Sequence, residues 1–289
     1  MKNSKGNTAK IIFSRKKIAL AVFLIITPVF SCAAEQASID RLVQKITPPL
    51  VVMEEKAAEK DRWYLDAFYE PSDILQGTRT GHWNELIQTF GYTHKNITGY
   101  ASFSELERFD VKDQTANVGA YLNFTDQYVH IEMGYGWDCH FIYQWQTIAE
   151  YGHKIYKDLF AQISYTYRAY RGDDTHLVVP GLIYYFGDSY ISANYGASYM
   201  EAHDTANIGV FKGDFAITEF LRWNCGAAVG GRLYDINGLD AGDEFGYILF
   251  TGVNIKLYKG INLRFGYSYG TEEPKFIKRS VNFAASAKF

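Results

Sequence analysis

The chain has 289 residues and a formal net charge of −3 at pH 7, with 23 Tyr, 20 Phe and only 6 Pro. This slightly acidic balance excludes the basic excess that nucleic-acid binding requires. Scarce proline and abundant aromatic residues favour β-strands. After the first 34 residues no apolar run is long enough for a transmembrane helix, so a membrane-spanning form would have to use strands.

The first 34 residues have the features of a secretory signal peptide. Several Lys and Arg residues precede an apolar run from Ile18 to Phe30, which falls short of the roughly 20 residues that span a bilayer. Small residues follow this run, and we expect cleavage after Ala33 or Ala34. Processing as a lipoprotein at Cys32 is the alternative.

Residues 35–62 differ in pattern from the rest of the chain. Apolar side chains recur there at helical spacing: Ile39, Leu42, Val43 and Ile46. Two prolines at 48 and 49 end the predicted helix. We expect a periplasmic N-terminal segment that is partly helical, with a plug inside the barrel as the alternative.

Residues 63–289 contain fourteen strand-like segments separated by turn signals. They lie at approximately 63–73, 83–93, 97–105, 115–124, 128–136, 146–156, 159–170, 176–186, 190–200, 207–217, 220–233, 245–257, 261–270 and 279–289. Lengths near ten residues match tilted strands that cross a bilayer. The pattern predicts an all-β fold: a transmembrane antiparallel up-and-down barrel of fourteen strands, with twelve and sixteen as alternatives.

Strict alternation of apolar and small polar residues supports this fold. In 128–136, Val129, Ile131, Met133 and Tyr135 alternate with His130, Glu132, Gly134 and Gly136. Apolar side chains facing lipid and polar ones facing the lumen are typical of outer-membrane barrels. A soluble sandwich also alternates, but the export signal and the alternation that continues to Phe289 favour the membrane.

The connections and the last strand indicate how the barrel is placed. Short turns near residues 95, 126, 158, 188, 219 and 259 alternate with mostly longer connections such as 107–114, 137–145, 235–244 and 271–279. Short turns are periplasmic in such barrels. We expect Phe283 and Phe289 to form the signal read by the barrel assembly machinery, and outer-membrane lipid and lipopolysaccharide to surround the protein.

Several aromatic motifs resemble the YaiO family of outer-membrane β-barrel proteins in their order and spacing. They are Trp63–Tyr69 followed by Trp83–Tyr92, Glu150 in Ala149–Tyr151, Ile163–Tyr167, Tyr184–Gly187 and the closing Asn282–Phe289. The resemblance covers about residues 63–289. It implies an outer-membrane location and a role linked to surface polysaccharide, and it supplies no catalytic residues.

Charged residues on the inward parity of the strands are the candidate functional residues. The lumen-facing candidates are His130, Glu132, Arg168, Lys212, Asp214, Arg222, Arg232 and Arg264. Their excess of cations predicts either a lumen that favours anionic solutes or a closed lumen cross-linked by Arg–carboxylate pairs. His130 and Glu132 could form an acid–base pair, but a polar wall is the simpler interpretation.

The functional expectation is a channel or accessory role in the envelope, with a glycan as a candidate partner and no nucleic acid. One alternative is an outer-membrane hydrolase acting on lipid or peptide at the outer rim, and another is a structural or adhesive barrel with a closed lumen. We favour a non-enzymatic role. Cys139 and Cys225 show no metal-ligand spacing and are expected to be isolated thiols, so we expect no metal and no cofactor.

Overall fold

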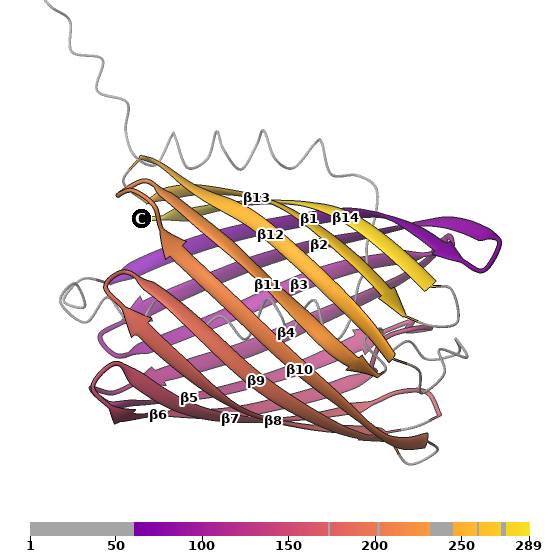
Figure 1. Ribbon diagram of the computed structural model, residues 1–289, viewed down its shortest axis with the longest axis horizontal. Coiled ribbons are helices and arrows are strands. Elements are labelled where there is room, and N and C mark those ends of the chain that lie inside the picture. The colour runs from indigo at the N-terminus through magenta and orange to yellow at the C-terminus, as the bar shows by residue number, and fades with distance from the viewer. Residues whose placement is uncertain (1–60, 173, 201–202, 232–244, 259, 273–275) are drawn as a thin grey trace, which may run out of the picture.

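The computed structural model describes all residues from 61 onward except 173, 201–202, 232–244, 259 and 273–275. These residues form one closed antiparallel barrel (Figure 1). Its strands are β1 (Arg62–Gln76), β2 (Arg79–His94), β3 (Ile97–Arg108), β4 (Val111–Asn123), β5 (Gln127–Trp137), β6 (Trp145–Tyr156), β7 (Leu159–Ala169), β8 (Asp174–Phe186), β9 (Ser189–Met200), β10 (His203–Ala216), β11 (Leu221–Gly231), β12 (Phe245–Tyr258), β13 (Ile261–Glu272) and β14 (Phe276–Lys288). The predicted fourteen-stranded all-β barrel is confirmed. The predicted signal peptide and most of the segment 35–62 lie outside the described residues.

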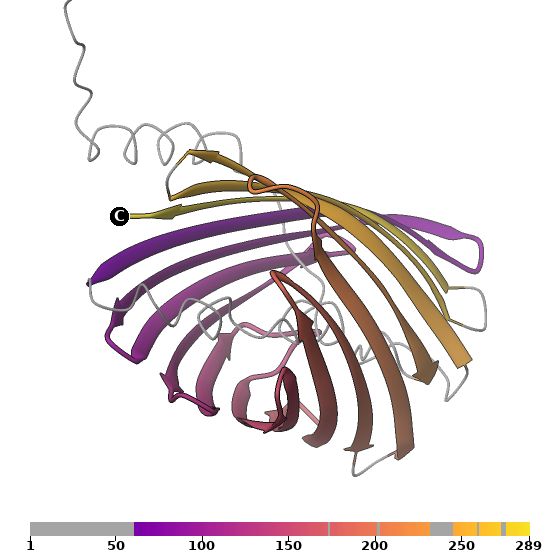
Figure 2. The same ribbon diagram turned by 60° about the vertical axis from the view of Figure 1, so that its left-hand side comes forward.

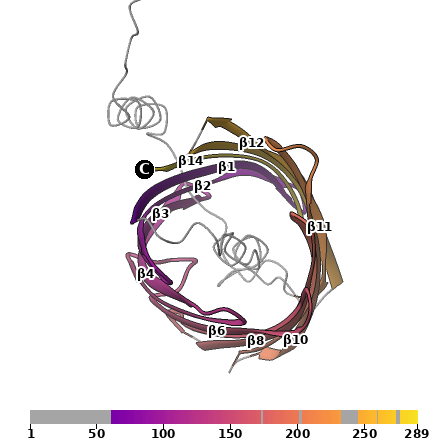
Figure 3. The ribbon, with the colours of Figure 1, turned by 90° about the vertical axis from the view of Figure 1, so that its left-hand side faces the viewer.

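The barrel closes by pairing its first strand with its last. Each strand pairs with its neighbours in sequence, and β1 also pairs with β14, as the view along the barrel shows (Figure 3). Trp63 N donates to Phe289 O at 2.9 Å and Phe289 N donates to Trp63 O at 3.0 Å. Closure therefore pairs the backbone of β1 and β14 across the seam, which a membrane-spanning sheet requires because lipid offers no hydrogen-bond partners.

The two faces of the barrel differ sharply in chemistry. On β5, Ile131 is 50% exposed on the outer face, whereas its neighbour Glu132 is 2% exposed on the inner face. The same parity holds around the barrel, so that the strands present apolar and aromatic residues outward. The strands are tilted relative to one another as they wrap around the barrel (Figure 2). A closed barrel with an apolar outer surface is the form in which strands cross a bilayer. No helix among residues 61–289 as described is long and apolar enough to cross a membrane.

Several strands are longer than the sequence pattern indicates. β1 has 15 residues and β2 has 16, and only residues 77–78 separate them. Their hairpin extends past the neighbouring strands at one end (Figure 1). Residues 107–114 and 271–279 were expected to be loops, but β3, β4, β13 and β14 pair through most of them. Each backbone amide and carbonyl gains a partner by extending the ladder, so the sheet continues beyond the bilayer.

The longer strands make the two ends of the barrel less different than expected. The end that carries the turns 95–96, 124–126, 157–158, 187–188, 217–220 and 259–260 is the one expected from the sequence to face the periplasm, and it is called the periplasmic end below. At the opposite end, called the outer end below, the turns at 77–78 and 109–110 are equally short. The longer connection at 138–144 agrees with the prediction, and the one at 235–244 lies outside the described residues. Cys139 and Cys225 are not joined by a disulfide.

Candidate functional site

The interior of the barrel has three regions: a hydrogen-bonded polar wall, an apolar belt near the outer end and a cationic arc near the periplasmic end. The polar wall is centred on Glu132 of β5. Tyr100 of β3 donates its hydroxyl proton to Glu132 Oε2 at 2.5 Å. Gln146 Nε2 of β6 donates to Glu132 Oε1 at 3.1 Å, and Arg168 Nε of β7 donates to Gln146 Oε1 at 2.8 Å. This chain links four strands and satisfies both carboxylate oxygens.

His130 belongs to the same network. Its Nε2 lies 2.8 Å from the Tyr100 hydroxyl oxygen, and because that hydroxyl gives its one proton to Glu132, the imidazole is the donor here. The Tyr121 ring stacks on His130 with centroids 4.0 Å apart and an interplanar angle of 9°. Tyr100 therefore holds both His130 and Glu132 inside the wall. This arrangement supports the interpretation of the two residues as part of a polar wall over their interpretation as an acid–base pair.

A second chain of hydrogen bonds runs towards β9. The Tyr128 hydroxyl lies 2.7 Å from Glu150 Oε1 and 3.1 Å from Gln162 Oε1. Gln162 Nε2 donates to Asn194 Oδ1 at 2.8 Å. Tyr128, Gln162 and Asn194 are buried, and most polar groups in this part of the wall bond one another, whereas Asn194 Nδ2 is buried without a hydrogen-bond partner among the described residues. Among the residues that the structure describes, no cluster of three or more His, Cys, Asp or Glu could hold a metal ion.

The connection between β5 and β6 folds into the outer end of the barrel. Asp113 of β4 accepts hydrogen bonds from three successive backbone amides, His140 N at 2.7 Å, Phe141 N at 2.8 Å and Ile142 N at 3.1 Å. Tyr143, which is buried, donates its hydroxyl proton to Asn117 Oδ1 on the inner wall at 2.9 Å. These contacts fix the connection inside the barrel and narrow the outer end on the β4–β5 side.

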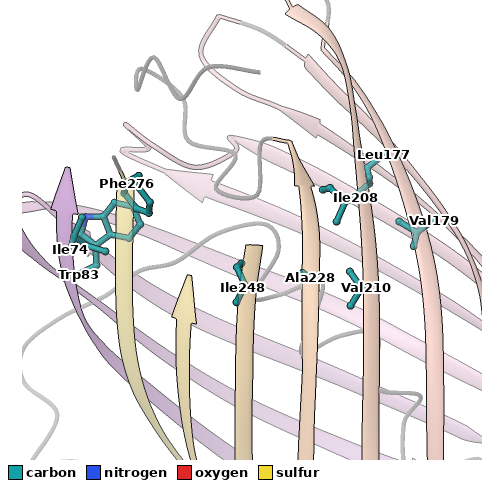
Figure 4. Packing of buried hydrophobic residues seen from close by; sticks show 9 residues of the cluster. All are labelled: Ile74, Trp83, Leu177, Val179, Ile208, Val210, Ala228, Ile248 and Phe276. Carbon is teal, nitrogen blue, oxygen red and sulfur yellow. The ribbon is translucent and has the colours of Figure 1, made fainter. Parts of the chain in front are cut away.

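The apolar belt lies on the inner face near the outer end (Figure 4). Its members are Ile74, Trp83, Leu177, Val179, Ile208, Val210, Ala228, Ile248 and Phe276. Phe109 and Phe141, from the connections at the outer end, pack against it. The Arg108 guanidinium lies 4.5 Å from the Trp83 ring centroid and 5.8 Å from that of Phe141. The belt could not be recognised from the sequence, because its members come from seven different strands.

The cationic arc lies near the periplasmic end of β10–β14. It consists of Lys212, Arg222, Lys256, Arg264 and Lys288, which share the inward parity of their strands. Arg222 bonds Asp214 through Nε at 2.7 Å and Nη2 at 2.6 Å, and donates to the backbone oxygen of Asp188 at 2.7 Å. Arg264 Nε donates to Asn254 Oδ1 at 2.9 Å. Lys256, Arg264 and Lys288 are exposed, in contrast to the polar wall.

The candidates from the sequence therefore fall into different regions. His130, Glu132 and Arg168 are buried in the polar wall, Lys212 is a buried member of the arc, and Asp214 is buried beside it. Arg222 is half-buried and Arg264 is exposed. Arg232 lies outside the described residues. Phe283 and Phe289 are exposed on the outer surface, and their role in assembly stays a prediction.

The sequence analysis missed most of the interior carboxylates. They are Asp66, Glu70, Glu85, Asp113, Glu150 and Glu272, all on the inward parity of their strands. Glu70 and Lys278, for example, form an ion pair of 2.8 Å whose side chains are 3% and 2% exposed. Their positions on the inward parity of each strand would have identified them as interior residues. The interior is thus balanced in charge overall, and the excess of cations is confined to the arc.

No protein-family model matches the sequence, and no curated protein matches it either. Solved structures share its fold. The toluene transporter TbuX of Ralstonia pickettii matches with a TM-score of 0.56 and 10% identity over 83% of this chain and 93% of its own. A mutant of the monoaromatic hydrocarbon channel TodX matches with 0.56 and 8% identity over 84% and 94%. A bacterial polysaccharide outer-membrane secretin matches with 0.51 and 8% identity over 81% and 100%.

These likenesses are far below the identity at which function transfers, and they show the fold. Together with the apolar outer surface and the closed fourteen-stranded sheet, they identify the protein as an outer-membrane β-barrel.

Proposed function

We propose that this outer-membrane barrel is a narrow channel that takes anionic solutes at its periplasmic end. The observation that carries the proposal is the difference in accessibility between the inner regions. The polar wall is buried and bonded to itself, whereas Lys256, Arg264 and Lys288 of the cationic arc are exposed. The accessible inner surface is therefore the one that carries the excess of positive charge.

The chemistry of the arc suits an oxyanion. Its five cations face two nearby carboxylates, Asp214 and Asp66, and Asp214 is already bonded to Arg222. Guanidinium and ammonium groups bind carboxylate and phosphate oxygens through charge-assisted hydrogen bonds. The half-buried amides Asn224, Asn254 and Asn262 lie among them and can bond the hydroxyl groups of a sugar.

A finer proposal is that the solute is an acidic surface polysaccharide. The amides can hydrogen-bond the hydroxyl groups of such a glycan, and the neighbouring cations can bind its acidic groups. The aromatic motifs that resemble those of the YaiO family are compatible with this assignment. The polysaccharide secretin with the same fold is compatible with it, although that likeness concerns the fold alone.

Reversal potentials in planar bilayers under a salt gradient test the channel proposal. The refolded protein should prefer anions. Arg264→Gln and Lys256→Gln should each reduce the anion-to-cation permeability ratio by about a factor of 7, because a unit charge ~7 Å from an ion in water stabilises an anion by about 0.6 kcal/mol and destabilises a cation by the same amount. Screening by salt reduces this effect, so the measurement belongs at low ionic strength.

Lys154→Gln is the matched control. Lys154 lies on β6, on the inward parity and near the same end, but outside the arc, and it is 3.9 Å from Asp126. Its neutralisation should change selectivity less than either arc variant. A barrel that prefers cations, or one that is folded and silent, would contradict the proposal, and the silent result would favour the structural or adhesive alternative.

Oligosaccharide block of the current tests the finer proposal. Oligogalacturonate should reduce the current at lower concentration than a neutral dextran of equal length. The difference should shrink in Arg264→Gln. Equal block by both sugars would leave an anion-selective channel without a link to acidic polysaccharide.

A further inference from the structure

The apolar belt is unexpected on the inner face of an outer-membrane barrel. Interiors of such barrels are polar because they are water-filled or closed by polar contacts. Here nine inward-facing apolar side chains form a single cluster from β1, β2, β8, β10, β11, β12 and β14 (Figure 4). Buried apolar side chains gathered on an otherwise polar inner face indicate that this part of the lumen excludes water.

The belt is also almost inaccessible. Val179 is 1% exposed and Ile248 is 2% exposed, although both lie on the inner face. Phe109 and Phe141 approach Trp83, with ring centroids 5.8 Å apart for Trp83 and Phe109. On the β8–β12 side the cluster consists of wall residues from adjacent strands and Phe250 of β12.

Two polar atoms on the belt face point to the nature of the cover. Trp83 Nε1 and Thr175 Oγ1 are buried and find no hydrogen-bond partner among the described residues. Thr175 lies two residues before Leu177 on the same face of β8. A buried polar atom normally has a partner. A polypeptide segment offers both apolar side chains for the belt and polar groups for these two atoms.

The chain itself has a segment with the required pattern. Ile39, Leu42, Val43 and Ile46 form one apolar stripe at helical spacing, and Pro48 ends the predicted helix. A short amphipathic helix of this kind is marginal in water unless its apolar face is packed.

The point at which this segment joins the barrel is at the periplasmic end. Asp61 Oδ1 lies 2.6 Å from His94 Nδ1 at the end of β2. Residues 48–60 number as many as the residues of β1 from Arg62 to Ile74. A fully extended chain spans about 3.3–3.6 Å per residue, so residues 48–60 can cover the length of β1 up to Ile74. Because β1 is tilted, the distance along the barrel axis is shorter than the strand itself. The predicted helix can therefore reach the belt through the lumen.

Charge along this route is weakly complementary. Residues 48–60 carry Glu54, Glu55 and Glu59 against Lys56 and Lys60, a net charge of −1, whereas the accessible wall near the periplasmic end carries the cationic arc. A chain that runs from Asp61 towards the outer end passes this arc. Attraction between the two favours a path through the lumen over one into the periplasm.

We propose that residues 38–47 form an amphipathic helix that packs its apolar stripe on the inner apolar belt, so that the chain's own N-terminal segment occupies the outer part of the lumen. The proposal therefore takes the alternative given in the sequence analysis, a plug inside the barrel, in place of the periplasmic N-terminal segment that the sequence led us to expect. The proposal rests on the belt and does not depend on anion selectivity, which is a property of the arc.

Cysteine accessibility tests the proposal in the folded full chain. In a Cys32→Ser, Cys139→Ser, Cys225→Ser background, Val210→Cys places a thiol in the belt and Asn254→Cys places one near the arc. A water-soluble maleimide should label Val210→Cys at least about tenfold faster when Leu42→Asp and Val43→Asp are added or residues 36–58 are deleted. Asn254→Cys should be labelled readily in every form, which shows that the reagent enters.

Disulfide formation supplies a second readout that needs no disrupted variant. Leu42→Cys on the apolar stripe should cross-link with Val210→Cys or with Ile248→Cys under mild oxidant. Gln44→Cys lies on the opposite side of the predicted helix and should cross-link far less. Heat modifiability on gels confirms that each variant is folded.

The outcomes are decisive in both directions. Faster labelling after the segment is altered, together with stripe-specific cross-links, supports the proposal. If Val210→Cys stays protected without the segment, the wall residues and Phe250, or a second molecule, cover the belt, and the proposal is wrong. If Val210→Cys is labelled as fast in the intact chain as Asn254→Cys, nothing covers the belt, and the proposal is also wrong.

Discussion

Three inward tyrosines each lie over a glycine directly opposite on the next strand. Tyr64 faces Gly91, Tyr100 faces Gly119 and Tyr128 faces Gly152. A Cβ at any of these glycines would collide with the facing ring. The glycines therefore provide the space in which the rings lie flat on the wall, and two of these rings carry the hydrogen bonds to Glu132 and Glu150.

Replacing one of these glycines should displace its tyrosine. Gly152→Ala should destabilise the barrel by about 1–3 kcal/mol, because the Tyr128 ring must move and its contact with Glu150 is lost. Gly196→Ala is the matched control on the same inner face, since its Cβ would meet nothing closer than 3.4 Å. Urea unfolding in lipid vesicles would measure both. Equal losses of stability would contradict the packing explanation.

At the scale of single elements, the barrel closes because its last strand, β14, pairs with β1. Deleting Phe289 removes two backbone hydrogen bonds to Trp63, each worth about 0.5–1.5 kcal/mol, and an apolar side chain that faces lipid. We expect a lower yield of inserted, heat-modifiable protein. Phe289→Leu keeps the backbone pairing and most of the apolar surface, so it should insert nearly normally. Normal insertion of the truncated chain would show that closure and recognition do not need this residue.

The strands themselves could be predicted because their outer and inner faces differ so strongly, as Ile131 and Glu132 illustrate. Their ends could not. Pro71, Ser72 and Asp73 are residues typical of turns, yet β1 continues to Gln76 because β2 and β14 offer backbone partners to this end. Three cations of the arc, Lys212, Arg222 and Arg264, were predicted one by one from strand parity. Their grouping, and the belt, depend on strand neighbours that only the closed sheet defines.

At the scale of the whole molecule, a buried ion pair crosses the seam where the barrel closes. Lys278 Nζ of β14 lies 2.8 Å from Glu70 Oε1 of β1, 208 residues away in sequence. Both side chains are almost inaccessible. No local pattern in the sequence could reveal this pair. It fixes the register between the first and last strands, and a slip by one residue would turn one partner outward to lipid.

The energetics of this pair predict an asymmetry between single and double variants. Lys278→Met alone leaves the Glu70 carboxylate buried without its cation and should cost about 3–5 kcal/mol, and Glu70→Met alone should cost a similar amount. The double variant buries two apolar side chains of similar size and should recover most of the loss, since the desolvation of both charges is avoided. Unfolding of all three variants in vesicles forms a double-mutant cycle. Additive losses would mean that the two groups do not interact, and that other contacts fix the register of the seam.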